Sequence, residues 1–301
     1  MRAGLLVLIV LAACGLMVCG GVWYRSRTIT PAAMLKRLPT EDAVVVFVDF
    51  AQLRRSDVIK LFDQSRVGQD PEYQSFIRKI EFNFRQDLDT AMLAFAPKGK
   101  YMLLKGRFDW KALKAYVLSV DGKCNNLFCK VVGSTPERRI SFFPVQQNLM
   151  ALAVSEDDTA ATRLNEVAPG ADPETPDAPI WLIIPPSIIR SRQGLPDGTQ
   201  MFARSLERAQ SVMLSVAPDG HRFAAKLNVR CTSVQDAVEM ASQLTKITSL
   251  LLELIEREHQ KPNPADLSGF LTAGTFHNEG TKVVGVWPIE QALLENLLGG
   301  T

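Results

Sequence analysis

The chain has 301 residues, of which 34 are basic and 32 acidic, so its formal net charge is only +2. Hydrophobic residues make up 47% of it, which excludes a disordered chain and allows one large or two medium domains with buried cores. The near balance of charge gives no overall attraction to nucleic acid, and we expect no nucleic-acid partner.

The first 27 residues predict a membrane anchor. Gly4 to Tyr24 contain no charged residue, Arg2 precedes the run, and Arg25 and Arg27 follow it. About 20 helical residues cross the ~30 Å hydrocarbon core of a bilayer, and the run ends in two aromatic residues, which suit the headgroup region. We therefore expect a single-pass protein of the inner (cytoplasmic) membrane, with the bilayer as the partner of Gly4 to Tyr24.

Two alternatives apply to the same segment. Leu11 to Cys14 resemble the lipobox of bacterial lipoproteins, in which Cys14 would carry the lipid, and a cleaved signal peptide would leave no anchor. Orientation is also open. Basic residues after the run favour a cytoplasmic C-terminal part, but large domains cross with limited regard to flanking charge. We favour a periplasmic, extracytoplasmic position for the C-terminal domain.

Leu38 to Phe62 read LPTEDAVVVFVDFAQLRRSDVIKLF, in which an acidic turn precedes an apolar strand that ends in Asp and is followed by a helix. This stretch, together with the apolar N-terminus and the repeat described below, resembles the opening of uncharacterised bacterial envelope proteins with one N-terminal membrane segment. The resemblance implies a membrane-tethered extracytoplasmic protein of unknown role and carries over no functional residue.

The elements of the first half follow in order. Continuous apolar, β-branched runs predict buried strands, and an apolar pair of runs around Pro-Lys-Gly predicts a β-hairpin. Asp109 is a predicted N-cap for an amphipathic helix. The predicted elements are a strand at Ala43 to Phe50, a helix at Ala51 to Phe62, the hairpin at Met92 to Lys105, the helix after Asp109, strands at Ile140 to Val145 and Leu149 to Val154, and a helix at Asp157 to Val167.

The second half repeats this plan. Met213 to Lys226 match Met92 to Lys105 at six of fourteen positions without a gap, at an offset of 121 residues. Thr232 or Ser233 caps a long helix whose apolar residues, from Val234 to Ile255, fall at three- and four-residue steps and should pack on a sheet. The other predicted elements are strands at Ile180 to Ile184, Gly274 to Phe276 and Val283 to Trp287, a loop at Arg192 to Thr199, and a helix at Ile289 to Leu298.

Together these elements predict an α+β fold made by tandem duplication of a strand-helix-hairpin-helix-strands-helix module. We expect mostly antiparallel sheets packed by helices, behind one N-terminal transmembrane helix. The predicted divisions are a membrane anchor (1–27), a first module (28–168), a Pro-rich, acidic connector (169–179) and a second module (180–301). Whether the two modules share one sheet stays open.

Cysteine spacing bears on redox chemistry. Cys124 and Cys129 frame a four-residue turn, which suits a small disulfide loop in an oxidising compartment. Two unpaired thiols beside a turn are the alternative, because sequence does not fix their geometry. The three histidines are scattered without the spacing of metal ligands, so we expect no metal and no cofactor.

Carboxylates are the remaining candidates for a polar site. They are Asp49 at the end of a strand, Asp87 and Asp89 in a polar turn, and the run Glu156 to Asp158. Each has a structural explanation as a helix cap or a turn residue, and we expect that role for Asp49, Asp87 and Asp89 before a catalytic one.

The chain contains none of the nucleophile, zinc or phosphate motifs that define common enzyme classes. Our leading hypothesis is therefore an envelope protein without evident catalytic activity, whose duplicated module binds or assembles with an envelope protein or cell-wall partner. The alternative is an enzyme of unrecognised class, a carboxylate-based hydrolase with its acids in a cleft between the modules. A third hypothesis is a role in a larger membrane complex, since Gly15 and Cys19 permit close helix packing.

Overall fold

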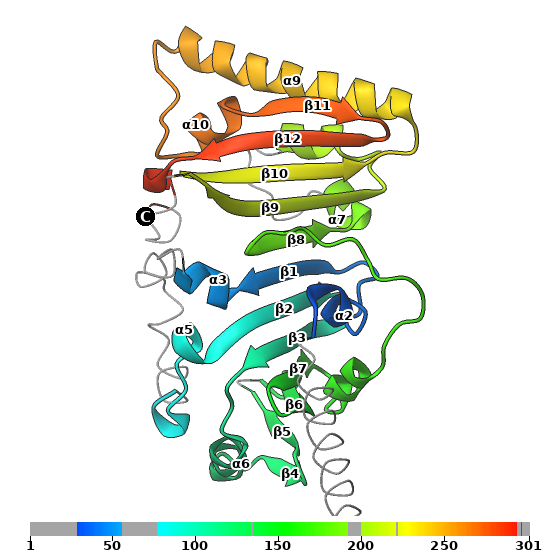
Figure 1. Ribbon diagram of the computed structural model, residues 1–301, viewed down its shortest axis with the longest axis vertical. Coiled ribbons are helices and arrows are strands. Elements are labelled where there is room, and N and C mark those ends of the chain that lie inside the picture. Colours follow the sequence, from blue (N-terminus) through cyan, green and yellow to red (C-terminus); the bar gives the residue numbers. More distant parts are fainter. Residues whose placement is uncertain are drawn as a thin grey trace, which may run out of the picture.

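The computed structural model describes residues 29–55, 77–133, 135–191, 200–220, 222–293 and 296. Its strands form one antiparallel sheet of 12 strands in the order β11-β12-β10-β9-β8-β1-β2-β3-β7-β6-β5-β4 (Figure 1). The strands are β1 (Val44–Asp49), β2 (Leu88–Ala96), β3 (Gly99–Gly106), β4 (Lys123–Asn125), β5 (Phe128–Val132), β6 (Arg139–Gln146), β7 (Leu149–Ser155), β8 (Ile180–Ile184), β9 (Ser211–Asp219), β10 (Arg222–Arg230), β11 (Thr275–Glu279) and β12 (Lys282–Ile289). The helices are α2 (Pro31–Leu35), α3 (Phe50–Arg55), α5 (Phe84–Asp87), α6 (Trp110–Ser119), η3 (Ala160–Asn165), α7 (Pro186–Ser191), α8 (Gln200–Ser205), α9 (Val234–Arg257) and α10 (Leu267–Thr272).

The sheet is built outward from the pairing of β1 with β8. Val46 lies opposite Leu182 and Phe47 opposite Trp181. From this centre each half has the same order of strands, β1-β2-β3-β7-β6 on one side and β8-β9-β10-β12-β11 on the other. The first half is extended by β5 and β4. Continuous apolar runs suit strands with apolar contacts on both faces. In β8, Trp181 and Ile183 pack in the core under α2 and η3, and Ile184 packs against the core of the second half.

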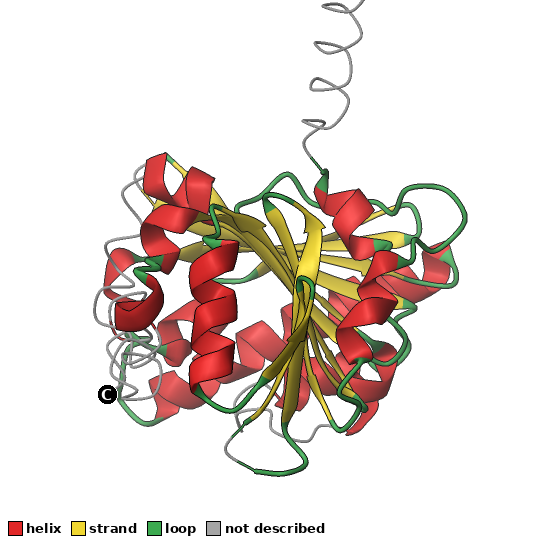
Figure 2. Cartoon of the chain, turned by 90° about the horizontal axis from the view of Figure 1, so that it is seen from below, coloured by secondary structure: helices red, strands yellow, loops and turns green. Residues whose placement is uncertain are grey.

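Helices lie on both sides of the twisted sheet, as Figure 2 shows. Alternate residues of β7 point to different cores: Met150 belongs to the core under α6, and Leu149 and Ala151 belong to the core under α2 and η3. In the second half α7, α8, α9 and α10 pack on the α6 side, where Val212, Leu227 and Trp287 form the core. The opposite side of the second half carries no helix among the described residues (Figure 1).

The long helix α9 begins at its predicted N-cap, since Ser233 Oγ accepts a hydrogen bond of 3.1 Å from the Asp236 amide. Its predicted apolar stripe is only partly correct. Ala237, Ala241 and Leu244 are buried against the sheet, whereas Val234 and Val238 are 51% and 44% exposed. The buried line also includes Met240 and Thr248, so the helix is rotated away from the first-turn valines.

The predicted fold class needs a correction in the number of sheets. The chain is α+β and antiparallel, but the pairing of β1 with β8 joins the strands of both halves into one 12-stranded sheet. Two smaller differences lie in the first half. The helix predicted at Asp157 to Val167 is the 3-10 turn η3, and the hairpin β4–β5 had no strand prediction, because three residues of β4 are too short for a clear period.

The predicted membrane anchor, residues 1–27, lies outside the described residues, as does the loop at Arg192 to Thr199. No helix in the described part of the chain is long and apolar enough to cross a bilayer. The longest helix, α9, instead packs one side on the sheet. A transmembrane helix in front of the fold, a signal anchor and a single-pass inner-membrane localisation were predicted, and these predictions are corrected because the described structure contains no such element.

The stack of Phe47 on Trp181 should be a main source of stability, because it holds the two halves together. The ring centroids are 5.0 Å apart, the planes meet at 20°, and Trp181 is fully buried. We expect Trp181→Ala to lower the free energy of unfolding by about 3–5 kcal/mol and Trp181→Phe to cost less, as measured by urea denaturation. Leu118→Ala, at a side chain that is 54% exposed, is the control and should change stability by less than about 0.5 kcal/mol. Equal effects of Trp181→Ala and the control would contradict this role of the stack.

Candidate functional site

Asp49 is a helix cap. It ends β1, and its Oδ1 accepts a hydrogen bond of 2.8 Å from the Gln52 amide in the first turn of α3. Its own amide donates to the Pro179 carbonyl at 2.7 Å, at the end of the connector. Both contacts fix where the chain leaves the sheet.

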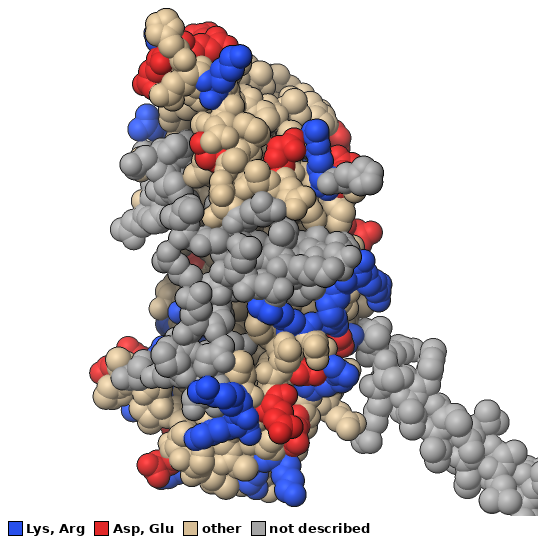
Figure 3. Space-filling model, turned by 90° about the vertical axis from the view of Figure 1, so that its left-hand side faces the viewer, with Lys and Arg blue, Asp and Glu red and all other residues tan. Residues whose placement is uncertain are grey.

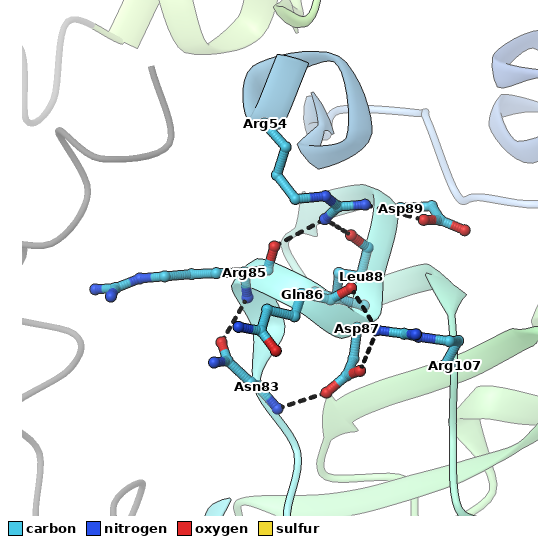
Figure 4. A network of polar contacts seen from close by, with 8 residues as sticks. All are labelled: Arg54, Asn83, Arg85, Gln86, Asp87, Leu88, Asp89 and Arg107. Carbon is cyan, nitrogen blue, oxygen red and sulfur yellow. Dashed lines mark hydrogen bonds and ion pairs between the residues drawn. The ribbon is translucent and has the colours of Figure 1, made fainter. Parts of the chain in front are cut away.

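Asp87 closes the short helix α5 (Figure 4). Its Oδ2 accepts a hydrogen bond of 2.8 Å from the Asn83 amide, and its Oδ1 lies 2.9 Å from Arg107 Nη2 on the chain that leaves β3. Asn83 in turn caps the helix by accepting from the Arg85 amide at 3.1 Å. The carboxylate therefore joins both ends of α5 to the β2–β3 hairpin.

Asp89 lies beside Arg54, the central cation of the same network. Arg54 Nη1 donates to the carbonyls of Arg85 and Leu88 at 2.8 and 2.6 Å, and its Nη2 lies 3.1 Å from Asp89 Oδ1 (Figure 4). The guanidinium thus ties α3 to the start of β2. The sequence does not single out Arg54 for this role, because its partners Arg85, Leu88 and Asp89 lie 31 to 35 residues further along the chain.

The structure brings Asp49, Asp87 and Asp89 to the same end of the first half, around α3 and α5, but each accepts from a scaffold donor. Two acids of the run Glu156 to Asp158 also have scaffold contacts, since Asp157 Oδ1 accepts a hydrogen bond of 2.9 Å from the Thr159 amide. The Asp157 amide donates to Ser155 Oγ at 2.9 Å, and Asp158 pairs with Lys130 at 2.7 Å. All of these acids come from the first half of the chain. No group of three or more metal-ligating side chains occurs in the described residues.

Cys124 and Cys129 face each other across β4 and β5 and are joined by a disulfide, with a Cα–Cα distance of 4.1 Å. The bond closes the hairpin at one edge of the sheet. Cys231 is a free, buried thiol whose pKa is raised by burial and, secondarily, by the charge of Asp236.

The largest feature without a structural explanation is the side of β9, β10, β11 and β12 that faces away from α9, which we call the open sheet face. No described helix covers it, in contrast to the covered faces of the first half (Figure 1). In the period-two alternation of β10, Lys226, Asn228 and Arg230 point to this face and Leu227 and Val229 to the core. Its other residues are Met213, Ser215, Ala217, Ala224, Thr275, His277, Glu279, Lys282, Val284 and Val286. Ser215 and Val284 are buried, and the longer polar side chains of the face are exposed or half-buried.

The cations of the open sheet face have few partners. Arg230 Nη2 and Lys282 Nζ share the carboxylate of Glu174, on the connector, at 3.3 and 3.2 Å. His277 lies 3.1 Å from Glu279. Lys226 has no ion pair in the described structure. All of these side chains are exposed or nearly so, and ion pairs of this kind contribute little to stability.

The alternation of polar and apolar residues in 222–230 is the sequence signal from which this face could have been found. A strand with one solvated face has such a pattern, whereas a strand buried on both faces has none. The distribution of charged side chains over the surface does not single out this face. On the side of the molecule in Figure 3, acidic side chains lie among the basic ones, and neither sign covers a continuous field.

Comparisons with known proteins give no family. No protein-family model matches the chain, and no curated protein matches it. Among solved structures it is similar to crystal form IV of TP0453, with a TM-score of 0.47 and 11% identity over 92% of this chain and 99% of that chain. Crystal form I of the same protein gives a TM-score of 0.48 and 12% identity over 91% of this chain and 100% of that chain.

If the acids around α3 and α5 are scaffold residues, Arg54, the central cation of their network, should contribute to the free energy of unfolding. Arg54→Met would remove the donor of the Arg85 and Leu88 carbonyls, and we expect a loss of about 1–3 kcal/mol in urea unfolding. Asp89→Asn keeps a hydrogen-bonding group at a half-exposed position and should cost less than about 1 kcal/mol. An unchanged unfolding midpoint in Arg54→Met would show that the network does not hold α3 in place.

The cysteine arrangement can be checked by mass spectrometry. Iodoacetamide applied to the native, unreduced protein should leave Cys124 and Cys129 unmodified and linked in one peptide pair. Cys231 should react only after unfolding, because burial keeps its thiol protonated and inaccessible. Carbamidomethylation of Cys124 and Cys129 without reductant would contradict the disulfide.

Proposed function

We propose that this protein is a binding or assembly protein and that the open sheet face contacts its partner. The observation that carries the proposal is that this face, alone among the main faces of the described sheet, has no covering helix. An antiparallel sheet can leave one face in water, so the lack of cover is compatible with a stable fold and leaves a broad, rigid surface.

The composition of the face suits a protein partner. Small and apolar residues such as Ala217, Ala224 and Val286 lie between the longer side chains of Lys226 and Arg230. Interfaces of proteins that associate reversibly are about as polar as the rest of the surface and carry a polar rim. Because the free charge of the face is basic, we expect acidic side chains on the partner.

The ion pairs between the connector and the open sheet face are of a kind that an acidic partner can replace. Glu174 forms ion pairs with both Arg230 and Lys282 at distances of 3.2 to 3.3 Å, and its single negative charge balances only one of the two cations. An acidic group of a partner can take the same place with no buried charge left unpaired, since all three side chains are solvated.

The hydrolase alternative has no such support, because Asp49, Asp87 and Asp89 each hold a scaffold contact and all belong to the first half. The envelope resemblance of residues 38–62 remains part of the proposal, as an expectation about where the partner is found.

Site-specific photo-crosslinking tests the proposal. A benzophenone amino acid in place of Asn228 lies at the centre of the open sheet face, and the same residue in place of Ser249 lies on the exposed side of α9. In cells, we expect a discrete adduct from position 228 and none from position 249. A band at twice the 33.3 kDa of the chain would identify a second copy as the partner. Lack of an adduct at 228, or the same adducts at both positions, would contradict the proposal.

Charge reversal provides the matched control. Lys226→Glu in the crosslinking protein should abolish the adduct from position 228, because it places a carboxylate against an acidic partner. Lys246→Glu, on the exposed side of α9, makes the same change of charge and should leave the adduct intact. Thermal unfolding of both variants should be unchanged, since both lysines are exposed.

A further inference from the structure

A groove in the first half lies apart from the open sheet face. Its volume is about 630 Å³, within the range of about 300–1,000 Å³ that is usual for small-ligand sites. It is bounded by the turn of the β2–β3 hairpin, the connection from β5 to β6, the end of β7 and the helical turn η3. In Figure 1 these segments meet at the right-hand ends of the strands.

The floor of the groove is kept clear by Gly99. Its φ is +149°, and a Cβ at this position would lie 2.6 Å from Ser155 Cβ and 2.7 Å from the Val154 carbonyl oxygen. Any other residue would therefore be strained and would push the hairpin turn away from β7. Glycine lets the two strands approach closely and leaves no side chain between them and the groove.

Tyr101 supplies a polar group to this floor. Its ring is buried in the core under η3 and is only 2% exposed. The residue lines the groove, and its hydroxyl has no hydrogen-bond partner within the described structure. A tyrosine hydroxyl on a buried ring ordinarily finds a partner, so this one is available to a ligand.

The rim carries both signs of charge. Lys98, in the hairpin turn, and Glu137 and Glu156, after β5 and β7, have no ion pair in the described part of the chain. Arg138 also lines the groove and has a contact of its own. Arg163 is held by Asp157, whose Oδ2 lies 3.0 Å from its Nη2. Hydrogen bonds from Thr159 keep the pKa of Asp157 below its usual value, so this pair stays charged at neutral pH and orients the guanidinium at the groove.

We infer that the groove binds a small zwitterion, a short peptide with free ends. Its carboxylate would lie at Lys98 and Arg163, its ammonium group at Glu137 or Glu156, and its backbone beside the Tyr101 hydroxyl. A ligand with only negative charge would meet the carboxylates of Glu137, Glu156 and Asp157, and a cation would meet the basic residues. Lys98 and Glu156 adjoin the paired residues Gly99 and Ser155 on neighbouring strands. Free charges of both signs therefore line one groove, and a ligand that carries both charges can pair with both.

Isothermal titration of the full-length protein with trialanine at low ionic strength tests this inference. We expect one site per chain and binding at least about tenfold weaker for trialanine that is acetylated at its N-terminus and amidated at its C-terminus, since each lost charge-assisted hydrogen bond costs about a factor of ten. Heat from neither peptide, or equal affinity for both, would overturn the inference.

Binding measurements on variants show whether trialanine binds in the groove or elsewhere on the surface. Lys98→Glu should weaken trialanine binding at least about tenfold, and Tyr101→Phe, which removes only the hydroxyl, should weaken it several-fold. Lys111→Glu on α6 makes the same charge change at an exposed position outside the groove and should bind as the unaltered protein does. Circular dichroism melting curves establish that each variant is folded. Affinity that is unchanged in both Lys98→Glu and Tyr101→Phe would place any binding elsewhere.

Discussion

Everything else in this fold depends on the antiparallel pairing of β1 with β8. Each is the first strand of its half, each is an apolar run, and the stacked rings of Phe47 and Trp181 lie on opposite strands at the junction. Without this pairing both strands would be unprotected sheet edges with unpaired backbone groups. With it, the two halves share one hydrogen-bonded sheet, and the outer edges are the short strand β4 and the strand β11, which α9 contacts.

The same pairing decides which side of the sheet each helix covers. When two equivalent strands pair antiparallel, the halves are related by a rotation about an axis through the sheet, and this rotation does not exchange the two faces. The helix after each hairpin, α6 in the first half and α9 in the second, consequently packs on the same side. The opposite side is covered only where the first half has α2 and η3 of its own. The open sheet face is thus the part of the second half that corresponds to the face under α2 and η3 in the first half, but without helices of that kind among the described residues.

Much of this arrangement could be predicted from local patterns. The hairpins expected at Met92 to Lys105 and Met213 to Lys226 are β2–β3 and β9–β10, the strand at Ile180 to Ile184 is β8, and Asp109 and Ser233 cap α6 and α9 as expected. The joining of the halves could not be predicted, because strand partners 136 residues apart leave no local trace. The ion pairs of Asp89 with Arg54 and of Asp87 with Arg107 could not be predicted either, because the partners come from distant segments. The groove could not be predicted from the sequence for the same reason, since Lys98, Glu137 and Arg163 come together only in the folded chain.

The central position of β1 has a consequence for synthesis of the chain. The partner that protects one side of β1 is β8, which is made only after the whole first half, whereas β2 to β7 can already be paired. For that interval Val44 to Asp49 form a long apolar edge, the kind of segment that joins to strands of other molecules. From the end of β7 at Ser155 to the end of β8 at Ile184 the ribosome adds 29 residues, which at about 5–20 residues per second takes on the order of a few seconds. The chain therefore has a period during its own production in which it is most exposed to aggregation, and this period ends when β8 docks.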